Sequence, residues 1–152
     1  MNPGWYGQKY PTLDDLVDFG SGLGADICFD RIVSAVYFAE APPLILIPVQ
    51  HGSLATMWAL AHELGHLCQH SGPKGRPFWG KDEYQANKWA ACALIPEARI
   101  QLHQNASVDN FIAALSANYE DIPPIDCHAR NLAYKIACHR LDVLNAKGFY
   151  SH

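Results

Sequence analysis

Residues 54–70 carry the clearest repeat of apolar positions in this chain. The apolar residues recur every three or four positions and are Met57, Leu60, Leu64 and Leu67. This spacing predicts an α-helix with one buried face, and Ser53 is suited to cap its first turn. Gly65 lies in the middle of the helix, where a glycine costs about 1 kcal/mol relative to alanine. We therefore expect Gly65 to leave room for another backbone segment to pass close by.

A second helix is predicted for residues 81–95, because Pro96 ends the helical pattern. Ala86, Ala90 and Ala93 recur along it at helical spacing. Such small side chains would allow this helix to lie close against the helix at 54–70.

Three strands are predicted before these two helices, from apolar alternation and short apolar runs. They cover Ala25–Phe29, Ile32–Ala39 and Leu44–Val49. Pro42 and Pro43 supply a turn between the second and third strands. We expect the strands to form a small antiparallel sheet packed on the helix at 54–70.

Capping residues and apolar spacing predict the remaining helices. One begins after Thr12 and ends in the Gly20–Gly24 region, a short one covers Glu97–His103, another follows Ser107 over Val108–Ala117, and a long one runs from Asp126 to about Asn145. The apolar stripe of the long helix contains Ala129, Leu132, Ile136 and Val143. Its basic residues Arg130, Lys135 and Arg140 are expected on a solvated side, which we favour over a DNA-binding surface.

The length of 152 residues suits one domain. We expect a single domain over 1–152, with a helix and sheet at 12–50, the two helices at 54–70 and 81–95, and the C-terminal helices at 97–145.

The net charge of −4 gives no reason to expect direct nucleic-acid binding. No apolar run approaches the about 20 residues of a membrane span. Five scattered cysteines and the absence of a secretory signal favour reduced thiols in the cytoplasm.

His62, Glu63 and His66 form the His-Glu-x-x-His motif of zinc-dependent hydrolases. On a helix the two histidines share one face, with Cβ atoms about 5–6 Å apart, so both can bind one zinc ion. Glu63 falls roughly 80° from their mean direction around the axis, which suits a general base that holds a zinc-bound water. A buried helix with two hydrogen-bonded histidines is the structural alternative. With this motif, the elements predict an α+β fold: a small three-stranded antiparallel sheet packed on a mainly helical, zincin-like domain.

A third zinc ligand is expected from the helix at 81–95, because a catalytic zinc has three protein ligands and one open position. We predict that Glu83 is this ligand, although Asp82 is an alternative. Glu83 could also be an exposed acidic residue that stabilises the first turn of the helix without binding metal. Asn87 lies one turn further on and offers a carbonyl to the second ring nitrogen of a ligating histidine. His70 lies about 12 Å along the helix axis from His62, so we assign it a structural or helix-end role.

The segments 62–70 and 83–96 together resemble the ImmA/IrrE family of metallopeptidases. That family pairs His-Glu-Leu-Gly-His with a second helix reading roughly Glu-x-x-Ala-Asn-x-Phe-Ala-Ala-x-Leu-Leu-x-Pro; here Trp89 takes the place of the phenylalanine. The resemblance implies that His62, His66 and Glu83 bind Zn²⁺, that Glu63 is the catalytic base and that Asn87 supports the site. It also implies a protein substrate, often a helix-turn-helix repressor.

We therefore predict a cytoplasmic zinc metallopeptidase that cleaves a protein, a transcriptional repressor in particular, by Glu63-assisted attack of a zinc-bound water. The alternative is a non-catalytic zinc-binding module that sequesters a repressor or toxin partner. Glu63 argues against this alternative, because a structural zinc site does not need it.

Overall fold

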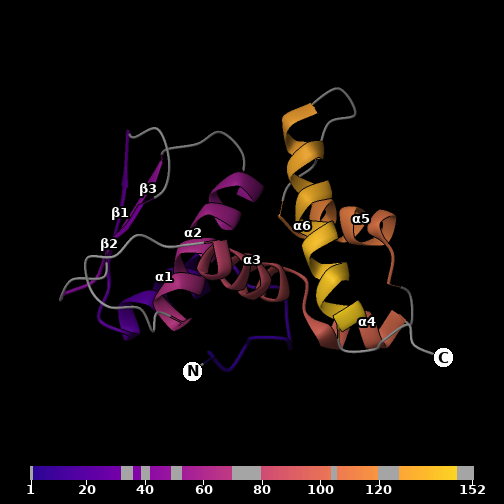
Figure 1. Cartoon of the computed structure of the whole chain (residues 1–152), viewed down its shortest axis with the longest axis horizontal. Helices are drawn as coiled ribbons and strands as arrows, with labels where there is room; N and C mark the ends of the chain where they lie inside the picture. Colours follow the sequence, from indigo (N-terminus) through magenta and orange to yellow (C-terminus); the bar gives the residue numbers. More distant parts are fainter. Residues whose placement is uncertain are drawn as a thin grey trace.

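The computed structural model describes residues 2–31, 36–38, 42–48, 53–69, 80–103, 106–119 and 127–146. Two central helices separate a small sheet on one side from the C-terminal helices on the other (Figure 1). The elements are α1 (Leu13–Gly22), β1 (Asp26–Asp30), β2 (Val36–Phe38), β3 (Leu44–Pro48), α2 (Ser53–Gln69), α3 (Gly80–Leu94), α4 (Glu97–His103), α5 (Val108–Tyr119) and α6 (Cys127–Ala146). No helix in these ranges is both long and apolar enough to cross a bilayer. The prediction of a mainly helical protein with a small sheet is confirmed.

Local capping accounts for the starts of two helices. The Thr12 side chain accepts a hydrogen bond from the backbone N–H of Asp15, whose side chain accepts one from Thr12 in return. This capping box satisfies two backbone donors that the first turn of α1 leaves free. The Ser107 hydroxyl accepts from the backbone N–H of Asn110 in the first turn of α5. The predicted caps Thr12 and Ser107 are therefore confirmed. Ser53, the predicted cap of α2, is instead the first residue of that helix, and Asp126, the predicted cap of α6, lies outside the described residues.

The sheet has three strands in the order β1-β3-β2, and it is mixed rather than antiparallel. β2 pairs antiparallel with β3, whereas β1 pairs parallel with β3, with Ile27 opposite Ile45. The prediction of an all-antiparallel sheet is wrong for the β1–β3 pair. Apolar patterns report which face of a strand is buried but not the direction of its neighbour. The ends of the predicted second and third strands, 32–35, 39 and 49, lie outside the described residues.

α2 is the element around which the others pack. It contacts α1, α3, α5, α6, β2 and β3. Its predicted apolar face is buried, and none of Met57, Leu60, Leu64 and Leu67 is more than 8% exposed. One cluster of buried residues extends from Leu16 in α1 to Leu144 in α6.

α3 passes α2 at a glycine, as the sequence predicts. A Cβ atom on Gly65 would lie 2.8 Å from the backbone oxygen of Ala86 and 2.9 Å from its Cα. The predicted small residues Ala86, Ala90 and Ala93 are all buried. A hydrogen at position 65 thus sets the spacing between the two central helices.

The C-terminal end of α3 is bound by side chains from α5 and α6. The Tyr119 hydroxyl donates to the carbonyl of Leu94 over 2.9 Å, and Arg140 Nε donates to the carbonyl of Ile95 over 2.7 Å. These contacts satisfy carbonyls that the helix end leaves without intrahelical partners.

Arg140 is 1% exposed, so its predicted place on a solvated side of α6 is wrong. It shares the buried face of α6 with Ala133, Ile136, Ala137 and Leu144, and its guanidinium serves the end of α3 instead of solvent. Arg130 and Lys135 are exposed as predicted. The cysteines whose side chains are described are not joined in disulfide bonds; they are Cys28, Cys68, Cys92 and Cys138.

Replacing Gly65 by alanine is expected to destabilise the protein by about 1–3 kcal/mol, because the methyl group overpacks against the α3 backbone. The better helix propensity of alanine, about 1 kcal/mol, offsets only part of this loss. Gly22→Ala is the matched control, since a Cβ at Gly22 has no heavy atom within 4 Å. Urea unfolding of both variants measures the difference. Both variants gain the helix propensity of alanine, so equal stability of Gly65→Ala and Gly22→Ala would contradict the close approach of the two helices.

Candidate metal centre

His62 and His66 lie one turn apart on the same face of α2. Their ring centroids are 4.9 Å apart and the ring planes are nearly perpendicular, at 87°. The side chains are 15% and 3% exposed, respectively. The helix therefore presents two imidazole edges from a mostly buried position, which limits how far either ring can turn away.

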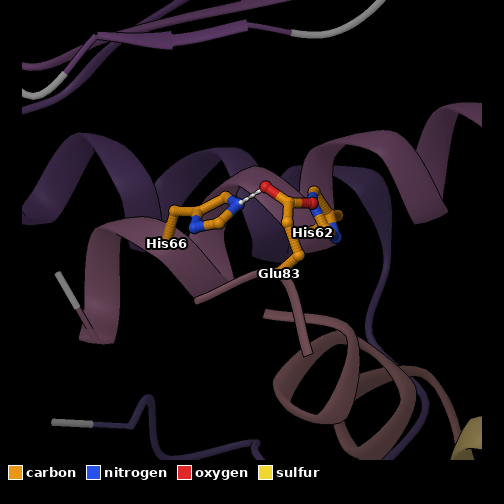
Figure 2. A group of neighbouring side chains, drawn as sticks. All are labelled: His62, His66 and Glu83. Atoms are coloured by element: carbon orange, nitrogen blue, oxygen red, sulfur yellow. Dashed lines mark hydrogen bonds and ion pairs between the residues drawn. The ribbon is translucent and has the colours of Figure 1, made fainter. Parts of the chain in front are cut away.

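Glu83, in the first turn of α3, bridges the two rings (Figure 2). Its Oε2 lies 2.9 Å from His62 Nε2, and its Oε1 lies 2.9 Å from His66 Nε2. The Glu83 side chain is 47% exposed, so the group opens toward solvent on the α3 side. Asp82 is not part of this group, and the structure thereby brings Glu83, rather than Asp82, to the histidines.

Asn87 engages the other ring nitrogen of His62. Its Oδ1 lies 2.8 Å from His62 Nδ1. An amide oxygen accepts a hydrogen bond, so this pairing puts the ring proton on Nδ1 and leaves the lone pair of Nε2 facing Glu83. That is the tautomer a metal-ligating histidine needs, and hydrogen-bonded partners of this kind usually orient such ligands.

Glu63 follows His62 on α2 and is 7% exposed. It lines an open pocket of about 270 Å³ together with His62, Glu83 and Asn87. Burial, and secondarily the negative charge of Glu83, raises the pKa of Glu63 to about 7. A carboxyl group with such a pKa can both accept and release a proton near neutral pH.

The donor set fits a divalent metal ion. One nitrogen from each histidine and an oxygen of Glu83 all lie within 4.8 Å of one another. Zinc binds nitrogen at about 2.0–2.1 Å and carboxylate oxygen at about 2.0–2.2 Å, so small side-chain rotations bring all three to one ion. Within the described residues, no further His, Cys, Asp or Glu joins the group. Two nitrogens and one carboxylate with an open position are the ligand pattern of catalytic rather than structural zinc.

The protonation of His66 supports the same conclusion. Burial, and then the proximity of His62, lowers the pKa of His66, although the Glu83 carboxylate opposes this shift. A neutral His66 ring carries a single proton, and when that proton lies on Nδ1, the lone pair of Nε2 can bind a cation.

Three residues beside the pocket were not predicted as part of a site. Lys135 of α6 lines the pocket together with Trp58 of α2, and the indole of Trp58 stacks on the ring of His139, with centroids 5.9 Å apart and planes at 13°. The sequence gives little indication that these residues lie beside the pocket. Lys135 and His139 are four residues apart and therefore share one face of their helix, but this spacing does not show which element packs against that face. His70, to which we assigned a structural role, lies outside the described residues.

Asn87→Ala is expected to weaken zinc binding about 10- to 100-fold, since it removes the partner that orients His62. Gln85→Ala is the matched control, because a residue two positions earlier on α3 faces away from the site. Competition with a chelating dye measures both dissociation constants. An unchanged zinc affinity in Asn87→Ala would show that the Asn87–His62 contact does not support a metal site.

A sequence model of the Peptidase_M78 family, described as the IrrE N-terminal-like domain, matches residues 19–119. The matched segment contains α2 and α3 with the whole His62–His66–Glu83 group, and it ends before α6. No curated protein and no solved structure matches the chain.

Proposed function

The chain belongs to the Peptidase_M78 family of IrrE N-terminal-like domains, and from this premise we propose that it is a zinc-dependent endopeptidase that cleaves a protein substrate. The observation that carries the proposal is the convergence of His62, His66 and Glu83 beside the buried carboxyl group of Glu63. A metal site that served only to hold the fold would not need a proton-transfer group at its edge.

His62, His66 and Glu83 would hold the zinc ion. When bound, zinc supplies Lewis-acid chemistry, in that it polarises a carbonyl group and makes water acidic near neutral pH. Asn87 keeps the His62 ring in the tautomer that presents Nε2. The exposed side of Glu83 leaves the group accessible to a substrate.

Glu63 would carry the protons of the reaction. It takes a proton from the attacking water, whose oxygen forms the new bond to the scissile carbonyl carbon. As the bond between carbon and nitrogen breaks, Glu63 gives this proton to the leaving amine nitrogen. The raised pKa of Glu63 suits a group that must be a base in one step and an acid in the next.

The substrate that we propose is a transcriptional repressor, a helix-turn-helix protein in particular. Support for this comes from the resemblance of the His62–His70 and Glu83–Pro96 segments to the ImmA/IrrE peptidases. We further propose that the protein acts in the cytoplasm, where such a substrate is found.

Glu63→Gln is expected to lower the cleavage rate by about 10²- to 10⁴-fold, the usual contribution of a positioned general base. Zinc content should remain unchanged, because the substitution leaves all three proposed ligands in place. The measurement incubates zinc-loaded protein with the product of a neighbouring repressor gene and reads the fragments by mass spectrometry. Glu83→Gln provides the contrast, since it should lose zinc and activity together.

Two outcomes would contradict this proposal. Full cleavage by Glu63→Gln would refute the role of Glu63 as the base. A repressor that binds the zinc-loaded wild-type protein and stays intact would favour the alternative, a non-catalytic module that sequesters its partner.

A further inference from the structure

Lys135 brings a positive charge to the wall of the candidate active site from outside the family-matched segment. Its helix, α6 (Cys127–Ala146), follows the segment 19–119 that matches the family. Even so, Lys135 lines the same pocket of about 270 Å³ as His62, Glu63 and Glu83. A peptide group that reaches Glu63 in a pocket of this size also comes close to Lys135.

Trp58 holds this cation in place. Lys135 Nζ lies 5.7 Å from the centroid of the Trp58 ring, which is within the range of a cation–π interaction. Trp58 is one helical turn before His62, and the two rings are 6.2 Å apart. His139, one turn after Lys135 on α6, stacks on the same indole. The position of the ammonium group is thereby tied to that of a proposed zinc ligand.

The ammonium group is available to a ligand. Lys135 is exposed, and within the described ranges no carboxylate lies in ion-pair contact with it. The Glu83 oxygens are taken up by the two histidines. His139 does not share the positive charge, because burial and then Lys135 itself lower the pKa of His139.

The described lining of the pocket carries two acidic groups, Glu63 and Glu83, and one basic group, Lys135. The two acidic groups lie beside the proposed zinc site, where the charge of a bound Zn²⁺ would offset theirs. Lys135 comes from α6 and forms no ion pair within the described residues, so an acidic side chain placed against it would be attracted. The arrangement favours an acidic residue at the position of a bound peptide that lies against Lys135.

We propose that Lys135 is a specificity-determining residue that binds an Asp or Glu side chain of the substrate close to the scissile peptide bond. The proposal rests on the peptidase function proposed above and adds a substrate preference to it. Lys135 would form an ion pair with the acidic residue, while the indole of Trp58 keeps the ammonium group oriented toward the cleft.

The test profiles cleavage of a synthetic peptide library with randomised positions by zinc-loaded wild type, Lys135→Met and Lys135→Glu. Mass spectrometry locates each cut. In the wild type, Asp and Glu should be enriched roughly two- to fivefold at one position within two residues of the cut, as an ion pair at an exposed site provides. Lys135→Met should lose this enrichment, and Lys135→Glu should replace it with Lys and Arg.

Arg130→Met is the matched control, because it removes the same charge from an exposed position on α6 that does not line the pocket. Its cleavage profile should equal that of the wild type. Zinc affinity and circular dichroism establish that all variants are folded and loaded.

The outcomes separate this inference from the function on which it rests. Cleavage by Lys135→Met with an unchanged profile, or with an equal loss for every peptide, would overturn the role of Lys135 and leave the peptidase function standing. If zinc-loaded wild type cuts no peptide at all, the proposed function and this inference both fail.

Discussion

The close contact between α2 and α3 at Gly65 is the constraint on which the candidate site depends. The two histidines come from one helix and Glu83 from the other, so the distance between the helix axes decides whether the three donors meet. A hydrogen at position 65 lets the backbone of Ala86 come as near as it does, and the buried alanines of α3 keep that approach along the helix. A glycine in the middle of a helix lowers the stability of that helix. At position 65 it also allows α3 to pack close enough to place Glu83 beside the two histidines.

The C-terminal helices stabilise the same arrangement from the far end of α3. Tyr119 and Arg140 satisfy the last carbonyls of α3, and α6 contacts both central helices. α6 also carries Lys135 to the pocket wall. The family-matched segment contains the proposed ligands, while the helix after it shapes the cleft in which they lie.

Much of the fold and of the site could be predicted from the sequence where the signal is local. Apolar repeats and capping residues such as Thr12 and Ser107 located the helices, and the His62–His66 spacing with Glu83 on the next helix anticipated the cluster that the structure forms. Structural features that depend on residues far away in the sequence were not predicted. The parallel pairing of β1 with β3 is one case, because alternation does not encode strand direction. Arg140 is another case. A basic residue predicts a solvent-exposed position, but Arg140 is buried and donates a hydrogen bond to the carbonyl of Ile95 at the end of α3.

In the proposed centre, two imidazoles and one carboxylate surround a single divalent ion with one position left open. X-ray absorption spectroscopy at the zinc edge of the zinc-treated protein, in wild type and in Glu83→Ala, tests this arrangement directly. We predict one zinc per chain in the wild type, with two nitrogen ligands from histidine, one carboxylate and one further light-atom ligand from solvent, and loss of bound zinc in Glu83→Ala. A zinc environment that Glu83→Ala does not alter, or one closed by a fourth protein ligand such as a cysteine sulfur, would contradict it.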